Sequence, residues 1–181
     1  MAPPGRDASM SVGRAYLIAL AWLPAAALLA LGPFALRWGG RPLAEAVPAP
    51  SSLPLVLAVL LASVVLHELM HVAGFRLLAG APARAVRLGL NRRTLTPFAC
   101  CADPVSARGY RATALLPAVA LGVLPALLAA ASGSGLLALW SWAMLAVAGG
   151  DVAAVWAIRR VPAQALVQDH PARVGCRVLD G

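Results

Sequence analysis

The stretch LPLVLAVLLASVVLHELMHVAGF, from Leu53 to Phe75, decides the fold class of this chain. It is apolar over a length that crosses a bilayer as a helix, yet its second half carries three ionisable side chains, His67, Glu68 and His71. Ionisable groups inside a membrane helix are costly and are interpreted first as functional. The stretch therefore predicts a transmembrane helix that carries a chemical site.

The composition of the whole chain also indicates a membrane protein. Of its 181 residues, 61% are hydrophobic and only 12% are charged. Soluble domains are roughly 45–50% apolar and about 25% charged. A soluble fold of this size could not bury so much apolar surface, so the composition excludes an ordinary soluble domain.

Four apolar runs, each about 20–24 residues long, are long enough to cross a bilayer as helices. They cover residues 15–36, 53–75, 112–131 and 136–158. Between the second and third runs, Val86, Leu88 and Leu90 alternate with less apolar residues, which is typical of a short strand. Residues 94–99 are its expected partner across a turn at 91–93. We therefore predict an all-α polytopic membrane protein of about four transmembrane helices, with a small β-hairpin on the cytoplasmic side.

A single membrane-embedded domain is expected over residues 15–160, between a cytoplasmic N-terminal segment at 1–14 and a cytoplasmic tail at 161–181. The end segments hold no apolar run, and we expect most of both to be mobile. The alternative for the first run is a cleaved signal peptide, with a small-residue site at 44–46. We favour a retained helix, because the run is longer than a typical signal core and arginines separate it from that site.

The 15 basic residues are all arginines, and the formal net charge is +8. Such an excess can indicate nucleic-acid binding, but here the arginines lie between the apolar runs, as they do in the cytoplasmic loops of membrane proteins. Only Arg37 and Arg41 lie between the first and second runs, so thirteen of the 15 are cytoplasmic if both termini are. We therefore predict cytoplasmic termini and expect no nucleic-acid partner.

The sequence His67-Glu68-Leu69-Met70-His71 matches the H-E-x-x-H pattern. Residues four apart on a helix share one face, so both imidazoles can bind one metal ion. Glu68 lies beside that face, where its carboxylate can take a proton from a water activated by the metal and pass it to a leaving amine. Zinc binds imidazole and suits this role. The structural alternative is a polar cluster that only packs helices.

A catalytic zinc needs a third protein ligand. Asp151 is the only acidic residue downstream of the motif that lies within an apolar run. Counted from the arginines that follow the second and fourth runs, it lies at the depth of the two histidines, roughly 7–14 Å inside the boundary. His170 competes for the role but lies in a polar tail. We therefore predict one zinc ion per chain, bound by His67, His71 and Asp151, with Glu68 as the catalytic base.

The three cysteines, Cys100, Cys101 and Cys176, show no spacing of a disulfide framework. The predicted topology places them in the cytoplasm, where thiols stay reduced. Adjacent cysteines are poorly placed to share one tetrahedral metal site. We therefore interpret Cys100 and Cys101 as small packing residues.

From about residue 53 to residue 160, the chain resembles the membrane zincin peptidases, a bacterial family related to the site-2 intramembrane metalloproteases. The resemblance rests on the H-E-x-x-H motif, the hairpin, the stretch 110–117 that leads into the third run, and the pair Gly150-Asp151. In the site-2 family the third ligand is an aspartate that glycine usually follows, whereas here glycines precede Asp151 and Val152 follows it.

The resemblance implies a zinc peptidase in which His67, His71 and Asp151 bind the metal and Glu68 is the general base. It implies a location in the plasma membrane of a bacterium. The implied partners are the lipid bilayer and a membrane-associated or transmembrane protein or peptide as substrate.

Two other classes of function share parts of this pattern. A metal-binding membrane protein without proteolysis, such as a sensor, chaperone or assembly factor, would keep the ligands but would not need Glu68 as a base. A catalytically dead structural relative would bind no stoichiometric zinc. Replacement of Glu68 separates the first alternative from a peptidase, and metal analysis separates the second.

Overall fold

The structure is a computed structural model that describes residues 5–91 and 96–179. Its α-helices are α1 Val12–Trp38, α2 Arg41–Glu45, α3 Leu53–Leu77, α4 Ala107–Pro117, α5 Leu124–Ser132, α6 Gly135–Val147 and α7 Gly149–Ala157. Shorter helical segments are η1 Pro50–Ser52, η2 Ala83–Ala85 and the π-helical η3 Ala118–Val123. The strands are β1 Arg6–Met10, β2 Val86–Asn91, β3 Thr96–Cys101, β4 Val105–Ser106, β5 Leu166–Asp169 and β6 Val174–Leu179.

Within residues 5–91 and 96–179, four helical spans are long and apolar enough to cross a membrane, which confirms the predicted polytopic class. They are Val12–Trp38, Pro50–Leu77, Ala107–Ser132 and Gly135–Ala157. The third span begins before the apolar run that the sequence shows. The reason is a cap: the Ser106 hydroxyl accepts a hydrogen bond from the backbone N–H of Gly109 and starts the helix at Ala107.

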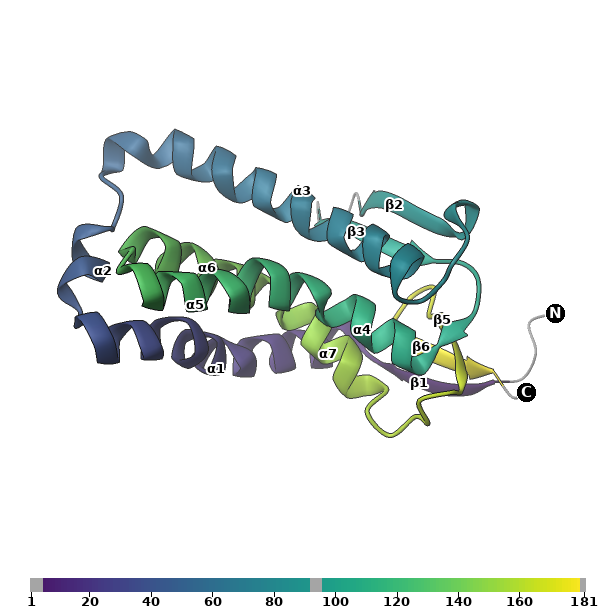
Figure 1. Ribbon diagram of the computed structural model, residues 1–181. Helices are drawn as coiled ribbons and strands as arrows, with labels where there is room; N and C mark the ends of the chain where they lie inside the picture. The colour runs from purple at the N-terminus through teal and green to yellow at the C-terminus, as the bar shows by residue number, and fades with distance from the viewer. Residues whose placement is uncertain (1–4, 92–95, 180–181) are drawn as a thin grey trace.

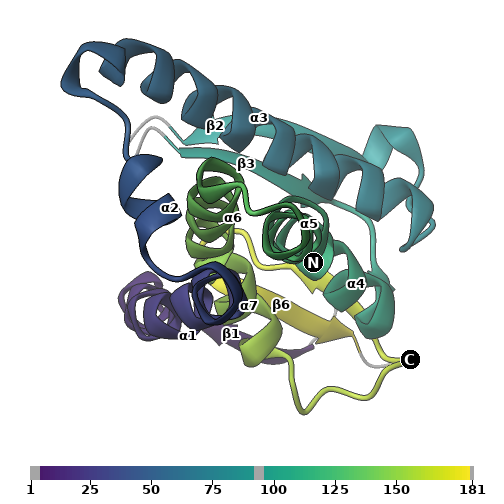
Figure 2. The ribbon, with the colours of Figure 1, turned by 60° about the vertical axis from the view of Figure 1, so that its left-hand side comes forward.

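Helices α1 and α3 lie on opposite sides of the helices α4 to α7 (Figures 1 and 2). α1 packs on α5, α6 and α7, whereas α3 packs mainly on α4. Apart from Ser63 near its middle, the buried residues of α3 all lie in its C-terminal half: His67, His71, Gly74 and Phe75. The half of α3 that carries the motif therefore faces the protein interior.

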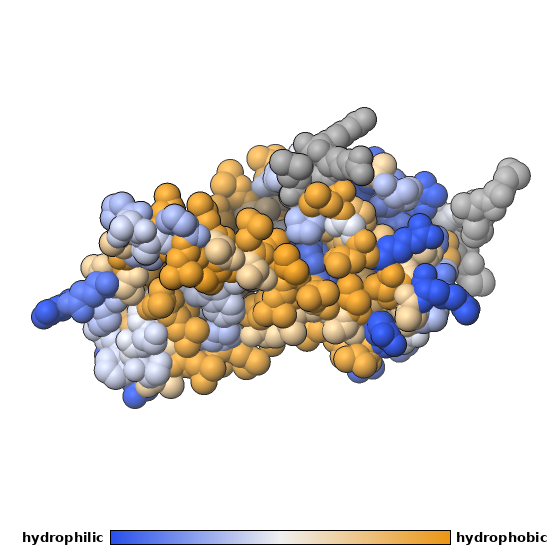
Figure 3. Space-filling view, turned by 90° about the horizontal axis from the view of Figure 1, so that it is seen from above, coloured by the Kyte–Doolittle hydropathy of each residue, from blue (hydrophilic) through white to orange (hydrophobic). Residues whose placement is uncertain are grey.

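The face of the molecule in Figure 3 is apolar along its middle and more polar toward both ends. Large apolar side chains project outward from the spans, and Leu17, Leu28, Leu61 and Leu128 are each at least 61% exposed. Soluble proteins rarely expose contiguous apolar surface of this extent. The chain is therefore a membrane protein, with lipid around the apolar middle.

The described strands, which include β1 and β6 from the N-terminal and C-terminal segments, lie at one end of the spans (Figure 1). Strands β1, β6, β5 and β4 form an antiparallel sheet in that order. The expectation that the end segments are mobile is therefore wrong for these strands. Their pairing joins the two ends of the chain, and such long-range pairing depends on tertiary context that neither segment shows alone.

The predicted hairpin between the second and third spans is confirmed as the two-stranded antiparallel sheet of β2 and β3. β3 runs to Cys101 rather than to residue 99. The backbone N–H of Ala102 donates to the carbonyl of Ala85, and this bond extends the ladder past the pair Val86 and Cys101. Of the predicted turn at 91–93, residues 92 and 93 lie outside the described residues.

The two glycines before Asp151 differ in their surroundings, which gives a matched test of the packing. A Cβ on Gly149 would lie 3.0 Å from Ala19 Cβ and 3.1 Å from its Cα on α1, whereas a Cβ on Gly150 would meet nothing within 4 Å. Gly149→Leu should therefore destabilise the protein by about 1–3 kcal/mol. Gly150→Leu should be neutral or slightly stabilising, because leucine favours a helix. Thermal unfolding in detergent measures both, and equal midpoints for the two variants would contradict this packing.

Candidate metal centre

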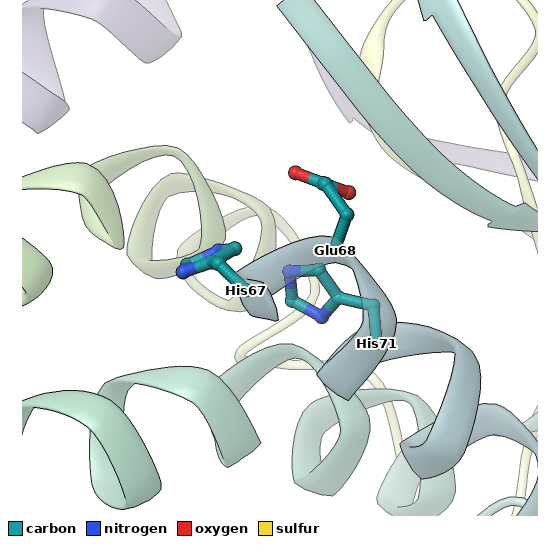
Figure 4. Close-up of side chains that lie close together, drawn as sticks. All are labelled: His67, Glu68 and His71. Atoms are coloured by element: carbon teal, nitrogen blue, oxygen red, sulfur yellow. The ribbon is translucent and has the colours of Figure 1, made fainter. Parts of the chain in front are cut away.

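Helix α3 directs both motif histidines into the protein interior, where His67 is 3% exposed and His71 is 7% exposed. Their ring centroids are 4.9 Å apart and the rings are nearly perpendicular, at 79°. Figure 4 shows both rings on one side of α3, with the Glu68 side chain beside them. One ligand atom from each of His67, Glu68 and His71 lies within 4.8 Å of the others. The helical spacing thus gathers the three motif side chains.

A carboxylate from the fourth span meets both histidines. That span breaks at Ala148, between α6 and α7, and Asp151 stands in the first turn of α7. Asp151 Oδ2 lies 3.0 Å from His67 Nε2, and Asp151 Oδ1 lies 3.1 Å from His71 Nε2. The structure thus brings all four predicted site residues together. Their roles as ligands and base stay predictions.

The backbone of α4 holds one of the two rings. His71 Nδ1 lies 3.2 Å from the carbonyl oxygen of Thr113. A carbonyl oxygen only accepts, so Nδ1 carries the hydrogen in this contact. In the neutral ring, Nε2 then presents a lone pair to Asp151 Oδ1, which is also an acceptor. Because these two acceptor atoms lie 3.1 Å apart, a proton or a cation must lie between them. Close contact between α3 and α4 requires Gly74, because a Cβ there would lie 2.9 Å from Thr113 Cγ2.

The donor set fits a zinc ion. Two imidazoles and one carboxylate are a known ligand set of catalytic zinc, which keeps a further position open. Tetrahedral zinc with ligands at about 2.0–2.2 Å separates neighbouring ligand atoms by roughly 3.3–3.6 Å. The contacts between the imidazole nitrogens and the carboxylate oxygens, at 3.0 and 3.1 Å, are only slightly shorter. His67 Nδ1 is buried without a partner among the described residues, so the second ring lacks the support that Thr113 gives to His71.

A cavity of about 160 Å³ opens beside these groups. Its lining residues come from α3, β3, α4 and α7 and include Glu68, His71 and Asp151. Glu68 is partly buried, and it lines the cavity together with Ala99 of β3. A peptide that entered this cavity would meet the motif carboxylate and the edge of the hairpin together.

Other candidates from the sequence lie elsewhere. His170, the competing candidate for the third ligand, lies in the turn between β5 and β6. Its backbone N–H donates to the carbonyl of Gly175, and its Nδ1 accepts from the backbone N–H of Ala172. Cys101 is buried, and its thiol donates to the carbonyl of Asp103, which agrees with a packing role.

Two features of the site had no signal in the sequence. Thr113 acts through its backbone carbonyl, which no side-chain pattern reveals. Tyr110 lines the cavity from α4 and packs edge-to-face on Phe75 of α3, with ring centroids 6.0 Å apart. In the sequence, residues 110–117 contributed to the family resemblance, but they gave no indication that Tyr110 lines a cavity.

Comparison with known proteins agrees with this geometry. The family model described as "Putative zincin peptidase" matches residues 60–166, which include the motif, the hairpin and Asp151. No curated protein and no solved structure matches the chain. The matched segment covers more than half of the chain, and we conclude that the protein belongs to this zincin peptidase family.

Proposed function

We propose that this chain is a zinc-dependent, membrane-embedded peptidase that hydrolyses a peptide bond near the cytoplasmic face of the membrane, as site-2 proteases do. One observation carries the proposal: the Nε2 atoms of His67 and His71 both meet the Asp151 carboxylate. Glu68 stands beside this group at a cavity. Membership of a zincin peptidase family supports the same chemistry.

His67, His71 and Asp151 would hold the metal. Zinc, when bound, supplies a Lewis acid and lowers the pKa of water to about 7. Thr113 keeps the His71 ring oriented through its carbonyl, which leaves Nε2 free to bind the metal. Burial of both histidines excludes bulk water from this side of the site.

Glu68 is the general base in this mechanism. Its carboxylate takes a proton from the attacking water and then donates that proton to the nitrogen of the leaving amine. Its position beside Ala99 of β3 puts the carboxylate in the cavity lining, where a substrate would enter. The same residue therefore serves both halves of the hydrolysis.

The free edge of β3 is where we expect an extended substrate to bind. Ala102 and Ala85 form a hydrogen-bonded pair of the ladder. Because such pairs alternate along an antiparallel ladder, the backbone groups of Cys101 and Ala99 point away from β2. The Cys101 N–H donates to Asp169, so we expect a substrate strand to pair at Ala99, which lines the cavity. A substrate strand could pair with this edge by β-augmentation. A helical substrate would first have to unwind, since its carbonyls are otherwise hydrogen-bonded.

The orientation follows from the charges. The two sheets lie at the end of the spans opposite to Arg37 and Arg41. The other described arginines lie in segments at or near the end that carries the sheets, so the positive-inside rule puts this end in the cytoplasm. We infer that the protein resides in the plasma membrane of a bacterium and acts on a membrane-associated or transmembrane protein or peptide.

Metal analysis tests the ligand set. Protein purified in detergent without chelator should hold about one zinc per chain by elemental mass spectrometry. His67→Ala and Asp151→Ala should lose it, because each removes one of three ligands. His170→Ala and Asp103→Ala are matched controls that should keep it. Zinc retained in Asp151→Ala would contradict the role of Asp151, and no zinc in the wild type would favour the structural alternative.

Replacement of the base tests the reaction. Glu68→Gln keeps the shape of the side chain but cannot accept the proton, so it should lower kcat at least about 100-fold and leave the zinc content unchanged. A fluorogenic peptide library in detergent supplies the substrates. Cleavage by Glu68→Gln at the wild-type rate would show that the mechanism is wrong. A wild type that binds zinc and cleaves no peptide would favour a non-proteolytic metal-binding protein.

A further inference from the structure

A carboxyl group outside the matched family segment lies next to the end of β3, the strand that lines the cavity. Asp169 is the last residue of β5, in the tail beyond residue 166. It is partly buried, beside an apolar cluster that includes Tyr110, Val167 and Cys176. Burial raises the pKa of the Asp169 carboxyl, although its contacts with Cys101 and Tyr110 act in the opposite direction. Burial of a carboxyl group costs free energy unless hydrogen bonds replace those it made with water.

Asp169 contacts the end of β3 from outside the cavity. Its Oδ2 accepts a hydrogen bond of 2.8 Å from the backbone N–H of Cys101, the last residue of that strand. The neighbouring Gln168 donates from its side chain to the carbonyl of Ala102, just after β3. Strand β5 thus holds the end of β3 through two side chains.

The Cys101 amide lies on the same edge of β3 as Ala99, because both residues direct their backbone groups away from β2. Ala99 lines the cavity together with Glu68 and Tyr110. A two-stranded hairpin is at best marginally stable alone, so the position of this edge depends on its outside contacts.

We propose that Asp169 is a positioning residue, whose carboxylate fixes the end of β3 at the substrate cavity through the Cys101 amide. This inference rests on the proposed peptidase function. Among the described residues, Asp169 forms no hydrogen bond or ion pair with His67, His71 or Asp151. Its loss should weaken substrate binding while the metal site and the chemical step are preserved.

The test compares Asp169→Ala, Asp169→Asn and Asp7→Ala with the wild type. Asp7 is the matched control, because it lies in the same sheet, is exposed, and accepts only the nearby Ser9 backbone N–H. With a peptide that the wild type cleaves, Asp169→Ala should raise KM about tenfold or more. Its zinc content and kcat should stay within about twofold of the wild type. Asp169→Asn should recover part of the affinity, since its amide oxygen still accepts from Cys101.

A second measurement does not depend on activity. Backbone hydrogen exchange of the β3 peptide should be faster in Asp169→Ala than in the wild type or Asp7→Ala. An unchanged KM, unchanged β3 exchange, or zinc and kcat that fall together at constant KM would each overturn the proposal. If Asp169→Ala does not fold, Asp169→Asn is judged by the same criteria. If the wild type cleaves no peptide, the peptidase proposal fails, and β3 exchange alone then decides whether Asp169 holds the edge.

Discussion

Two imidazoles contact one carboxylate inside an apolar helical bundle, and much of the fold positions these three side chains. Polar groups so far from water are costly unless they are paired or bind a metal. Here His67 and His71 meet opposite oxygens of Asp151, and His71 has a backbone partner on α4. The contact joins three of the four membrane spans, so the position of each span affects the site.

The fourth span is held on two sides. Gly149 lets α7 approach α1 closely, just before Asp151. At the other end of α7, the Arg111 side chain on α4 donates to the carbonyls of Ile158 and Val161. Cations near a helix C-terminus also interact favourably with its dipole. α4 therefore fixes both the histidine helix, through Thr113, and the aspartate helix, through Arg111.

The strands add a second structural layer at one end of the bundle. The hairpin places β3 beside Glu68 at the cavity, while the sheet of β1, β6, β5 and β4 brings Asp169 to the end of that same strand. The cavity is thus bounded by transmembrane helices on one side and by extended backbone on the other. This division suits a peptidase that works at a membrane surface, because the helices supply the buried ligands and the strand edge can bind an extended chain.

The local sequence was enough for the features that depend on local physics. Apolar length predicted four spans, helical spacing predicted that His67 and His71 share a face, and alternation predicted β2. Depth along the spans also singled out Asp151. These signals are contained within one helix or strand, so one sequence shows them.

The tertiary structure alone decided the contacts between distant segments. The pairing of β1 with β6, the Thr113 carbonyl on His71 and the Asp169 carboxylate on Cys101 each join residues far apart in the chain. Backbone donors and acceptors are the same at nearly every residue, so sequence does not mark which ones are used. The sequence of the tail does not show that β6 pairs with β1, from the opposite end of the chain, and we therefore expected the tail to be mobile.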